Sequence, residues 1–146
     1  MPMPRNVLLF SIRPEYAVKI FCEKTKKVEL RRIRPRLMEE GDLVIVYVSS
    51  PKKALVGSFE VKKIIEEPLP KLWVKVEKTA CISRKDFDIY YSDRTVGIGI
   101  YIENIQSYNE PVTLQILREN INNFHPPQSY RYLRDKEIEV LKSLVN

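Results

Sequence analysis

The sequence predicts an α+β protein, a small mixed or antiparallel β-barrel flanked by short helices. Apolar runs of strand length outnumber the helical patterns, and the predicted strands do not alternate regularly with helices as in a parallel α/β sheet. The 146 residues form no repeats and no interdomain linker, and they are enough to bury a core. We therefore expect a single domain over residues 1–146.

The first half of the chain is expected to be mostly strand. A helix should begin at Pro14, because proline suits a first helical turn, and should end between residues 22 and 25. A tight turn at residues 40–42 precedes a buried strand. The expected strands are 7–12, a basic strand from Val28 onward, 43–48, and 54–61 extended through 65.

The second half should contain short helices around one further strand. Ser83 is a candidate N-cap for a helix over 84–91, and the tandem prolines at 126 and 127 exclude helix over residues 124–133. Two glycines, Gly97 and Gly99, indicate close backbone approach or a bend in their strand. The remaining expected elements are helices at about 72–76, 114–118 and 134–145, and a strand at 95–102.

Composition narrows the classes of partner. The net charge of +6 makes this a basic protein and favours a polyanion. The apolar runs are too short to span a membrane, and the polar N-terminus does not resemble a signal peptide, so we expect a cytoplasmic location and no membrane partner. Two cysteines, Cys22 and Cys81, with a single histidine argue against a metal site; we expect buried thiols, with a disulfide left open, and no cofactor.

The most informative segment is residues 24–36, which holds seven basic side chains and one carboxylate, Glu29. From Val28 onward apolar and charged residues alternate, as on a half-buried strand with one face toward a ligand. Arg32, Arg34 and Arg36 would then point to the opposite face from Glu29. They would contact phosphate there, or protect an edge strand from aggregation.

The same segment resembles the motif of the ASCH group within the PUA-like superfamily, Gly-x-Lys-x-x-Glu-x-Arg. Lys26, Glu29 and Arg31 match the motif, whereas Lys24 stands at the glycine position, which normally allows a positive φ. Further segments resemble archaeal-type, single-domain members of this group: Ser11–Ala17, Gly41–Asp42, Ser83–Phe87 and Pro126–Leu133. The resemblance implies a pseudo-barrel with a cleft where the motif strand meets the first helix, and binding of RNA or a modified nucleobase.

The candidate ligand-binding residues lie on or beside the motif strand and near the tandem prolines at 126 and 127. Glu29 and Gln128 would read a base, while Lys24, Lys26, Arg31 and Arg34 would hold phosphate. The set is completed by Ser129, Tyr130 and Arg131. Tyr130 would stack on a base, and Arg131 would contact phosphate. The competing interpretations are an ion pair of Glu29 on a solvated face, and a core position for Tyr130.

The leading functional hypothesis is a non-catalytic protein that binds RNA or a modified nucleotide, as a monomer or weak dimer. A second hypothesis is a hydrolase, either a ribonuclease or an amidohydrolase acting on an acylated nucleoside, with Lys26, Glu29 and Arg31 as catalytic candidates. The resemblance disfavours the amidohydrolase, since Glu29 stands where those relatives place a threonine. A third hypothesis is a protein-interaction module in transcription or translation, with a protein partner.

Overall fold

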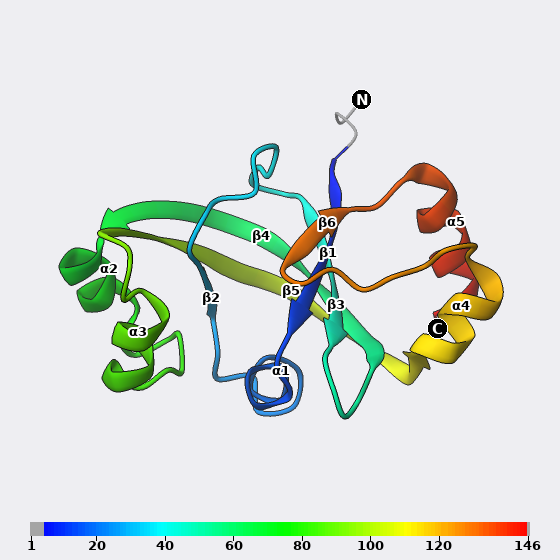
Figure 1. Cartoon of the computed structure of the whole chain (residues 1–146), viewed down its shortest axis with the longest axis horizontal. Helices are drawn as coiled ribbons and strands as arrows, with labels where there is room; N and C mark the ends of the chain where they lie inside the picture. The colour runs from blue at the N-terminus through cyan, green and yellow to red at the C-terminus, as the bar shows by residue number, and fades with distance from the viewer. Residues whose placement is uncertain (1–4, 146) are drawn as a thin grey trace.

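A mixed sheet of six strands, in the order β2-β5-β4-β3-β1-β6, forms the centre of the computed structural model, which describes residues 5–145. β1 and β3 are parallel and the other neighbours antiparallel. The sheet curves into a half-barrel, open between β2 and β6 (Figure 1). The α+β class is confirmed. The strands are β1 (Val7–Ile12), β2 (Val28–Arg31), β3 (Leu43–Val48), β4 (Ala54–Pro68), β5 (Val96–Thr113) and β6 (Tyr130–Tyr132).

Five helices surround the sheet in three places. α2 (Leu69–Val76) and α3 (Arg84–Tyr90) lie at one end of the long β4–β5 ribbon, α4 (Leu114–Asn120) and α5 (Asp135–Leu144) at the other, and α1 (Pro14–Phe21) beside β1 (Figure 1). Two helices have the N-caps that their sequences favour: the hydroxyls of Ser83 and Thr113 accept from the backbone N–H three residues on. The expected cap at Ser83 is therefore confirmed.

The core divides into three apolar clusters that follow this arrangement. The central one packs α1 against the sheet, and includes Phe10, Ile20 and Phe59. The second lies under α4 and α5, and the third joins β2 to α2 and α3 through Val28 and Phe87. Because β2 is covered by the third cluster on one side and lies beside α1, it is positioned between two helical layers.

The expected strand at 95–102 is the first half of β5, which continues to Thr113. The part after Ile102 is mostly polar and exposed, apart from Ile105, Tyr108 and the buried Val112, and it includes Pro111, so its sequence does not look like a strand. It is held by pairing with β4, whose register shifts at three places along this ribbon. Pairing with a partner strand therefore overrides weak local propensity here.

The prediction that the basic segment continues as an alternating strand is wrong beyond Arg31. All four residues of β2 are buried, and the chain leaves the sheet at Arg32. Arg32 pairs with Asp93, and Arg34 donates to the backbone oxygen of Met38 at 2.7 Å. Both arginines therefore bind acceptors outside the sheet, one distant in sequence and one four residues on.

The cysteine and membrane expectations have different outcomes. Cys22 is exposed, Cys81 is half-buried and both are free, so the prediction of two buried thiols is wrong. Cys22 is the C-cap residue of α1, and it lies at the surface instead of on the apolar face of the helix. No helix in residues 5–145 has the length and hydropathy needed to cross a bilayer.

Candidate functional site

A cleft of about 740 Å³ lies where β2 meets α1, α3 and the segment before β6. Its floor is formed by Lys26, Glu29 and Arg31, and Gln128 and Ser129 line the side nearest β6. Five of the nine residues predicted for ligand binding are therefore brought together in one place. The walls and rim add residues that the sequence analysis did not assign to the site: Ser11, Arg13, Tyr16, Ser49, Asp86 and Tyr90.

The floor is a buried cluster of three charges. Lys26, Glu29 and Arg31 expose only 2%, 7% and 8% of their surface. One carboxylate oxygen of Glu29 lies 3.6 Å from the Lys26 amine, and the other 3.0 Å from the Arg31 guanidinium. The two bases thus bind opposite oxygens of one acid. The interpretation of Glu29 as an ion pair on a solvated face does not describe this buried arrangement.

Lys26 is held by groups on both sides of the cleft. Its amine donates to the backbone oxygen of Ala80 at 2.6 Å and lies 5.1 Å from the centre of the Tyr16 ring. Burial lowers the pKa of Lys26, and the negative charge of Glu29 opposes that shift. A lysine in this position is closer to releasing its proton at neutral pH than a solvated one.

Arg31 bridges the open side of the half-barrel. One terminal nitrogen donates to the hydroxyl of Ser129 at 2.8 Å and to its backbone oxygen at 3.3 Å. The other donates to Glu29 and to the backbone oxygen of Ser11 at 3.4 Å, and the guanidinium stacks on Phe10 with its carbon 4.3 Å from the ring centre. Most donors of Arg31 are therefore committed to the protein, joining β2 to β1 and to the approach of β6.

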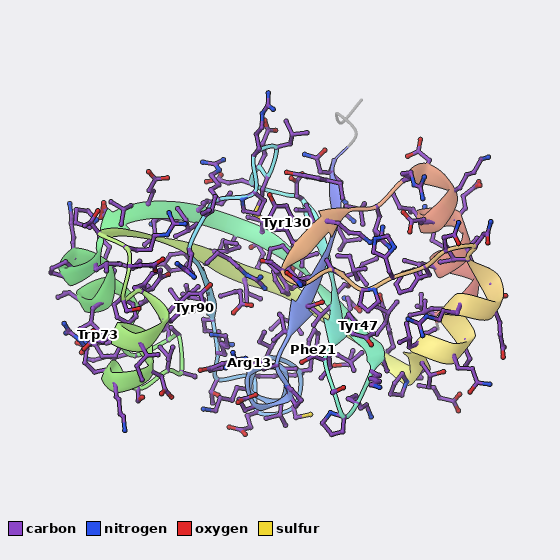
Figure 2. The ribbon with its side chains drawn as sticks, in the orientation of Figure 1. Arg13, Phe21, Tyr47, Trp73, Tyr90 and Tyr130 are labelled. Carbon is purple, nitrogen blue, oxygen red and sulfur yellow. The ribbon has the colours of Figure 1, made fainter. Side chains whose placement is uncertain are left out.

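The rim of the cleft carries both charges and aromatic rings. Arg13 is exposed at the start of α1, and among residues 5–145 it has no ion-pair partner. Asp86 and Glu15 add carboxylates to the same rim. Tyr90, the last residue of α3, lines the cleft on the side of β2 (Figure 2), and its hydroxyl donates to the backbone oxygen of Leu30 at 3.4 Å.

Burial raises the pKa of both cleft tyrosines, Tyr16 and Tyr90, so their hydroxyls stay protonated at neutral pH. The helices predicted from Pro14 onward and over residues 84–91 contain Tyr16 and Tyr90. Neither residue was assigned to a site in the sequence analysis. The helical pattern shows which residues are apolar, but not that two helices from distant parts of the chain face each other across β2.

Four predicted site residues lie outside the cleft lining. Lys24 is exposed with a φ of 58°, so the motif's glycine position keeps its left-handed conformation without a glycine. Arg34 binds Met38, and Tyr130 packs on Phe10 with ring centres 6.3 Å apart. Arg131 points away from the cleft and pairs with Glu137 at 2.9 Å. Alternation along β6 separates Arg131 from Tyr130, which lies in the central core cluster.

The cleft contains no cluster of metal ligands. Within the described part of the chain, no group of three or more His, Cys, Asp or Glu side chains is placed to hold a metal ion. The chemistry that the site itself offers is hydrogen bonding, charge and aromatic stacking, supplied by the floor, the rim and the two tyrosines.

Comparison with known proteins gives a family match and a close structural likeness. A family described as a domain of unknown function, DUF365, matches residues 6–119. The chain is 29% identical over 142 residues to an ASCH domain-containing ribonuclease from Zymomonas mobilis, covering 97% of this chain and 94% of the relative. A crystal structure of ASCH from Zymomonas mobilis superposes with a TM-score of 0.90 at 28% identity, over 98% of both chains.

A more distant likeness concerns the fold alone. Human THYN1, in a crystal structure with DNA containing 5-methylcytosine, superposes with a TM-score of 0.58 at 15% identity, over 95% of this chain and 96% of that one. The half-barrel is therefore a PUA-like fold.

Proposed function

The chain belongs to the DUF365 family and to the ASCH group of PUA-like proteins, and from this membership we propose that its cleft binds RNA. The observation that carries the proposal is the buried Lys26–Glu29–Arg31 cluster at the floor of an open cleft with a free arginine, Arg13, at its rim. Such a floor offers fixed polar groups to a base, and the rim offers charge to a phosphate.

Each part of the cleft suits a different part of a nucleotide. Glu29 keeps unused lone pairs beside its two ion pairs, so it can accept from a base amino group, and the exposed Gln128 amide can read a base edge. The rings of Tyr16 and Tyr90, which both line the cleft, would stack on a base. Arg13 would contact phosphate. Arg31 would position other residues of the cleft rather than contact the RNA, because its donors already bind Ser129, Ser11 and Glu29.

RNA is favoured as the polyanion because the relative from Zymomonas mobilis is named a ribonuclease. A base that stacks between tyrosines must be unpaired, so single-stranded RNA fits the cleft better than a duplex. The net charge of +6 is consistent with a polyanionic ligand.

Cleavage of the bound strand is a second candidate function, favoured by the lowered pKa of Lys26 at the cleft floor. Its amine would accept the proton of a ribose 2′-hydroxyl while the 2′-oxygen bonds to phosphorus and the bond to the 5′-oxygen breaks. The protonated amine would return that proton to the departing 5′-oxygen. The products would be a 2′,3′-cyclic phosphate and a 5′-hydroxyl.

The test of binding is fluorescence anisotropy of labelled single-stranded RNA at 50 mM salt, with wild type and Arg13→Gln. We expect wild type to bind, and Arg13→Gln to weaken binding about threefold to tenfold and to reduce the salt slope by about 0.7, the contribution of one phosphate contact. The control Lys78→Gln removes one charge from an exposed residue in the turn after α2, outside the cleft. It should change the affinity by less than about twofold.

The same samples, run on a gel, separate the two candidates. Intact RNA after prolonged incubation supports binding alone. Cleavage that is lost in Lys26→Met but kept in Lys78→Gln supports the ribonuclease. Absence of binding to RNA of mixed sequence at low salt would disprove both.

A further inference from the structure

Two smaller hollows continue the cleft along the protein surface. The middle hollow, of about 370 Å³, shares Ser11, Ser49 and Gln128 with the cleft. The distal hollow, of about 590 Å³, shares Lys53 and Leu114 with the middle hollow. Because each hollow shares lining residues with the next, the three are neighbours on the surface, and together they are called the trough below.

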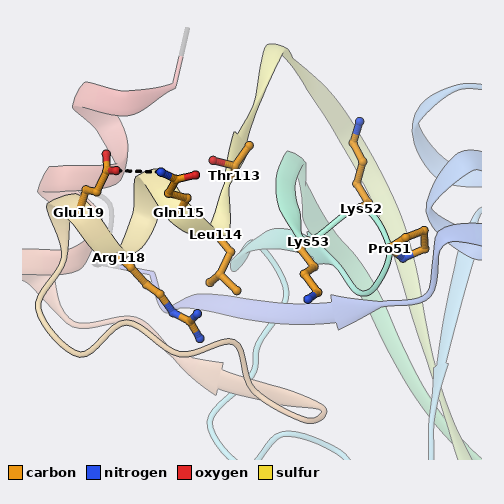
Figure 3. Close-up of a pocket in the computed structure, with 8 residues that line it drawn as sticks. All are labelled: Pro51, Lys52, Lys53, Thr113, Leu114, Gln115, Arg118 and Glu119. Carbon is orange, nitrogen blue, oxygen red and sulfur yellow. Dashed lines mark hydrogen bonds between the residues drawn. The ribbon is translucent and has the colours of Figure 1, made fainter.

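The far end of the trough is basic. Lys53 and Arg118 extend to the same side of the distal hollow, with Leu114 between them (Figure 3). Neither has an ion-pair partner within residues 5–145. The nearby carboxylate of Glu119 instead accepts from the Gln115 amide at 3.3 Å. The two cations are therefore available to an external anion.

The charge of Arg118 also reaches the middle hollow. Burial raises the pKa of Tyr47, which lines that hollow, and the positive charge of Arg118 opposes the shift. Arg118 therefore lies close enough to influence groups in both hollows. Positive charge at the far end and polar Ser and Gln side chains at the junction are what a sugar–phosphate backbone requires.

We propose that the trough binds a single-stranded RNA several nucleotides long, with one nucleotide in the cleft and with Lys53 and Arg118 contacting phosphates beyond it. This inference rests on the proposed function, and it specifies the ligand as an oligonucleotide rather than a mononucleotide or nucleoside. The cleft alone has the volume of a single small ligand. The two further hollows would have no role in binding such a ligand.

The test compares RNA length between variants. Affinities for single-stranded RNA of mixed sequence, two and eight nucleotides long, are measured by competition against a labelled eight-mer. Wild type should bind the eight-mer at least about tenfold more tightly than the dinucleotide. Lys53→Gln with Arg118→Gln should lose about tenfold for the eight-mer and less than about twofold for the dinucleotide, and its salt slope should fall by about 1.4.

The matched control is Lys62→Gln with Lys78→Gln. It removes the same number of positive charges, two, from exposed residues outside the trough. It should shift both affinities equally and by less than about twofold. All four replaced side chains are exposed, and circular dichroism checks that both variants fold.

Two different failures can be told apart. RNA binding that is insensitive to length, or equal in the trough and control variants, would overturn the trough and leave binding in the cleft standing. Absence of any RNA binding by wild type would overturn the proposed function and the trough together.

Discussion

Glu29 is the residue on which the charged floor depends, because its two carboxylate oxygens bind different bases. Burying three charges is costly unless each is paired, and here one acid compensates two bases. The sequence spacing predicted that Glu29 and Arg31 share a face, and they do. The spacing could not show that Ala80, 54 residues from Lys26, provides the backbone oxygen that holds the lysine.

The lowered pKa of Lys26 leads to a prediction at the residue scale. The folded protein holds the Lys26 proton more weakly than the unfolded chain does, for which 10.5 is the ordinary value. Between the folded pKa and 10.5 the unfolded chain therefore binds more protons, and this group makes the free energy of unfolding rise with pH. A ¹³Cε NMR titration of the lysines should show Lys26 titrating below 10.5.

The Glu29→Gln variant tests the cause of that shift. Removing the carboxylate deletes the attraction that opposes desolvation, so the pKa of Lys26 should fall further. The variant should also be less stable by about 3 kcal/mol in urea unfolding, since two buried cations lose their counter-ion. If Lys26 in the wild type titrated at or above 10.5, burial would not lower its pKa, and this prediction would be wrong.

At the scale of elements, the two glycines of β5 mark where helices and a neighbouring strand approach it closely. A Cβ on Gly97 would lie 2.7 Å from both Leu72 and Tyr91, which belong to the cluster under α2 and α3. A Cβ on Gly99 would lie 3.1 Å from Cγ1 of Ile65, a tight contact but less so than those at Gly97. The sequence prediction of close approach or a bend at these glycines therefore has a specific cause at each position.

This difference predicts unequal costs of adding one methyl group. Gly97→Ala should destabilise the protein by about 1–3 kcal/mol, because a buried tyrosine ring must move. Gly99→Ala should cost less, because a shift of a few tenths of an ångström at Ile65 is enough to accept the methyl group. Urea unfolding of both variants measures this order. Equal costs at the two positions would contradict the packing described for α2 and α3.

At the scale of the whole molecule, Arg31 closes the side of the half-barrel that backbone pairing leaves open. β2 pairs only with β5, and β6 pairs only with β1, so no ladder joins β2 to β6. The guanidinium joins them through Ser129 and Ser11, and the N–H of Ser11 donates to the backbone oxygen of Ser129 at 3.0 Å.

Weakening this bridge should loosen β6 without unfolding the sheet. Arg31→Lys keeps the positive charge but cannot reach Ser129, Ser11 and Glu29 at once. Amide hydrogen exchange over residues 129–132 should become at least about tenfold faster, since charged hydrogen bonds worth about 1.5–3 kcal/mol are lost. Exchange in β4 should stay unchanged. Arg32→Lys, which alters an exposed pair with Asp93, should leave β6 protected.

The fold class, nearly all of the helices and strands, and the motif residues Lys26, Glu29 and Arg31 could be predicted from the sequence. Hydrophobic periodicity, proline positions and caps are local signals, and these elements depend on local signals. The tertiary structure decided where the basic strand ends, how far β5 extends and which motif neighbours reach the cleft. Those outcomes depend on pairing and packing between segments far apart in the chain, as with Arg31 and Ser129 or α1 and α3, and no local pattern encodes them.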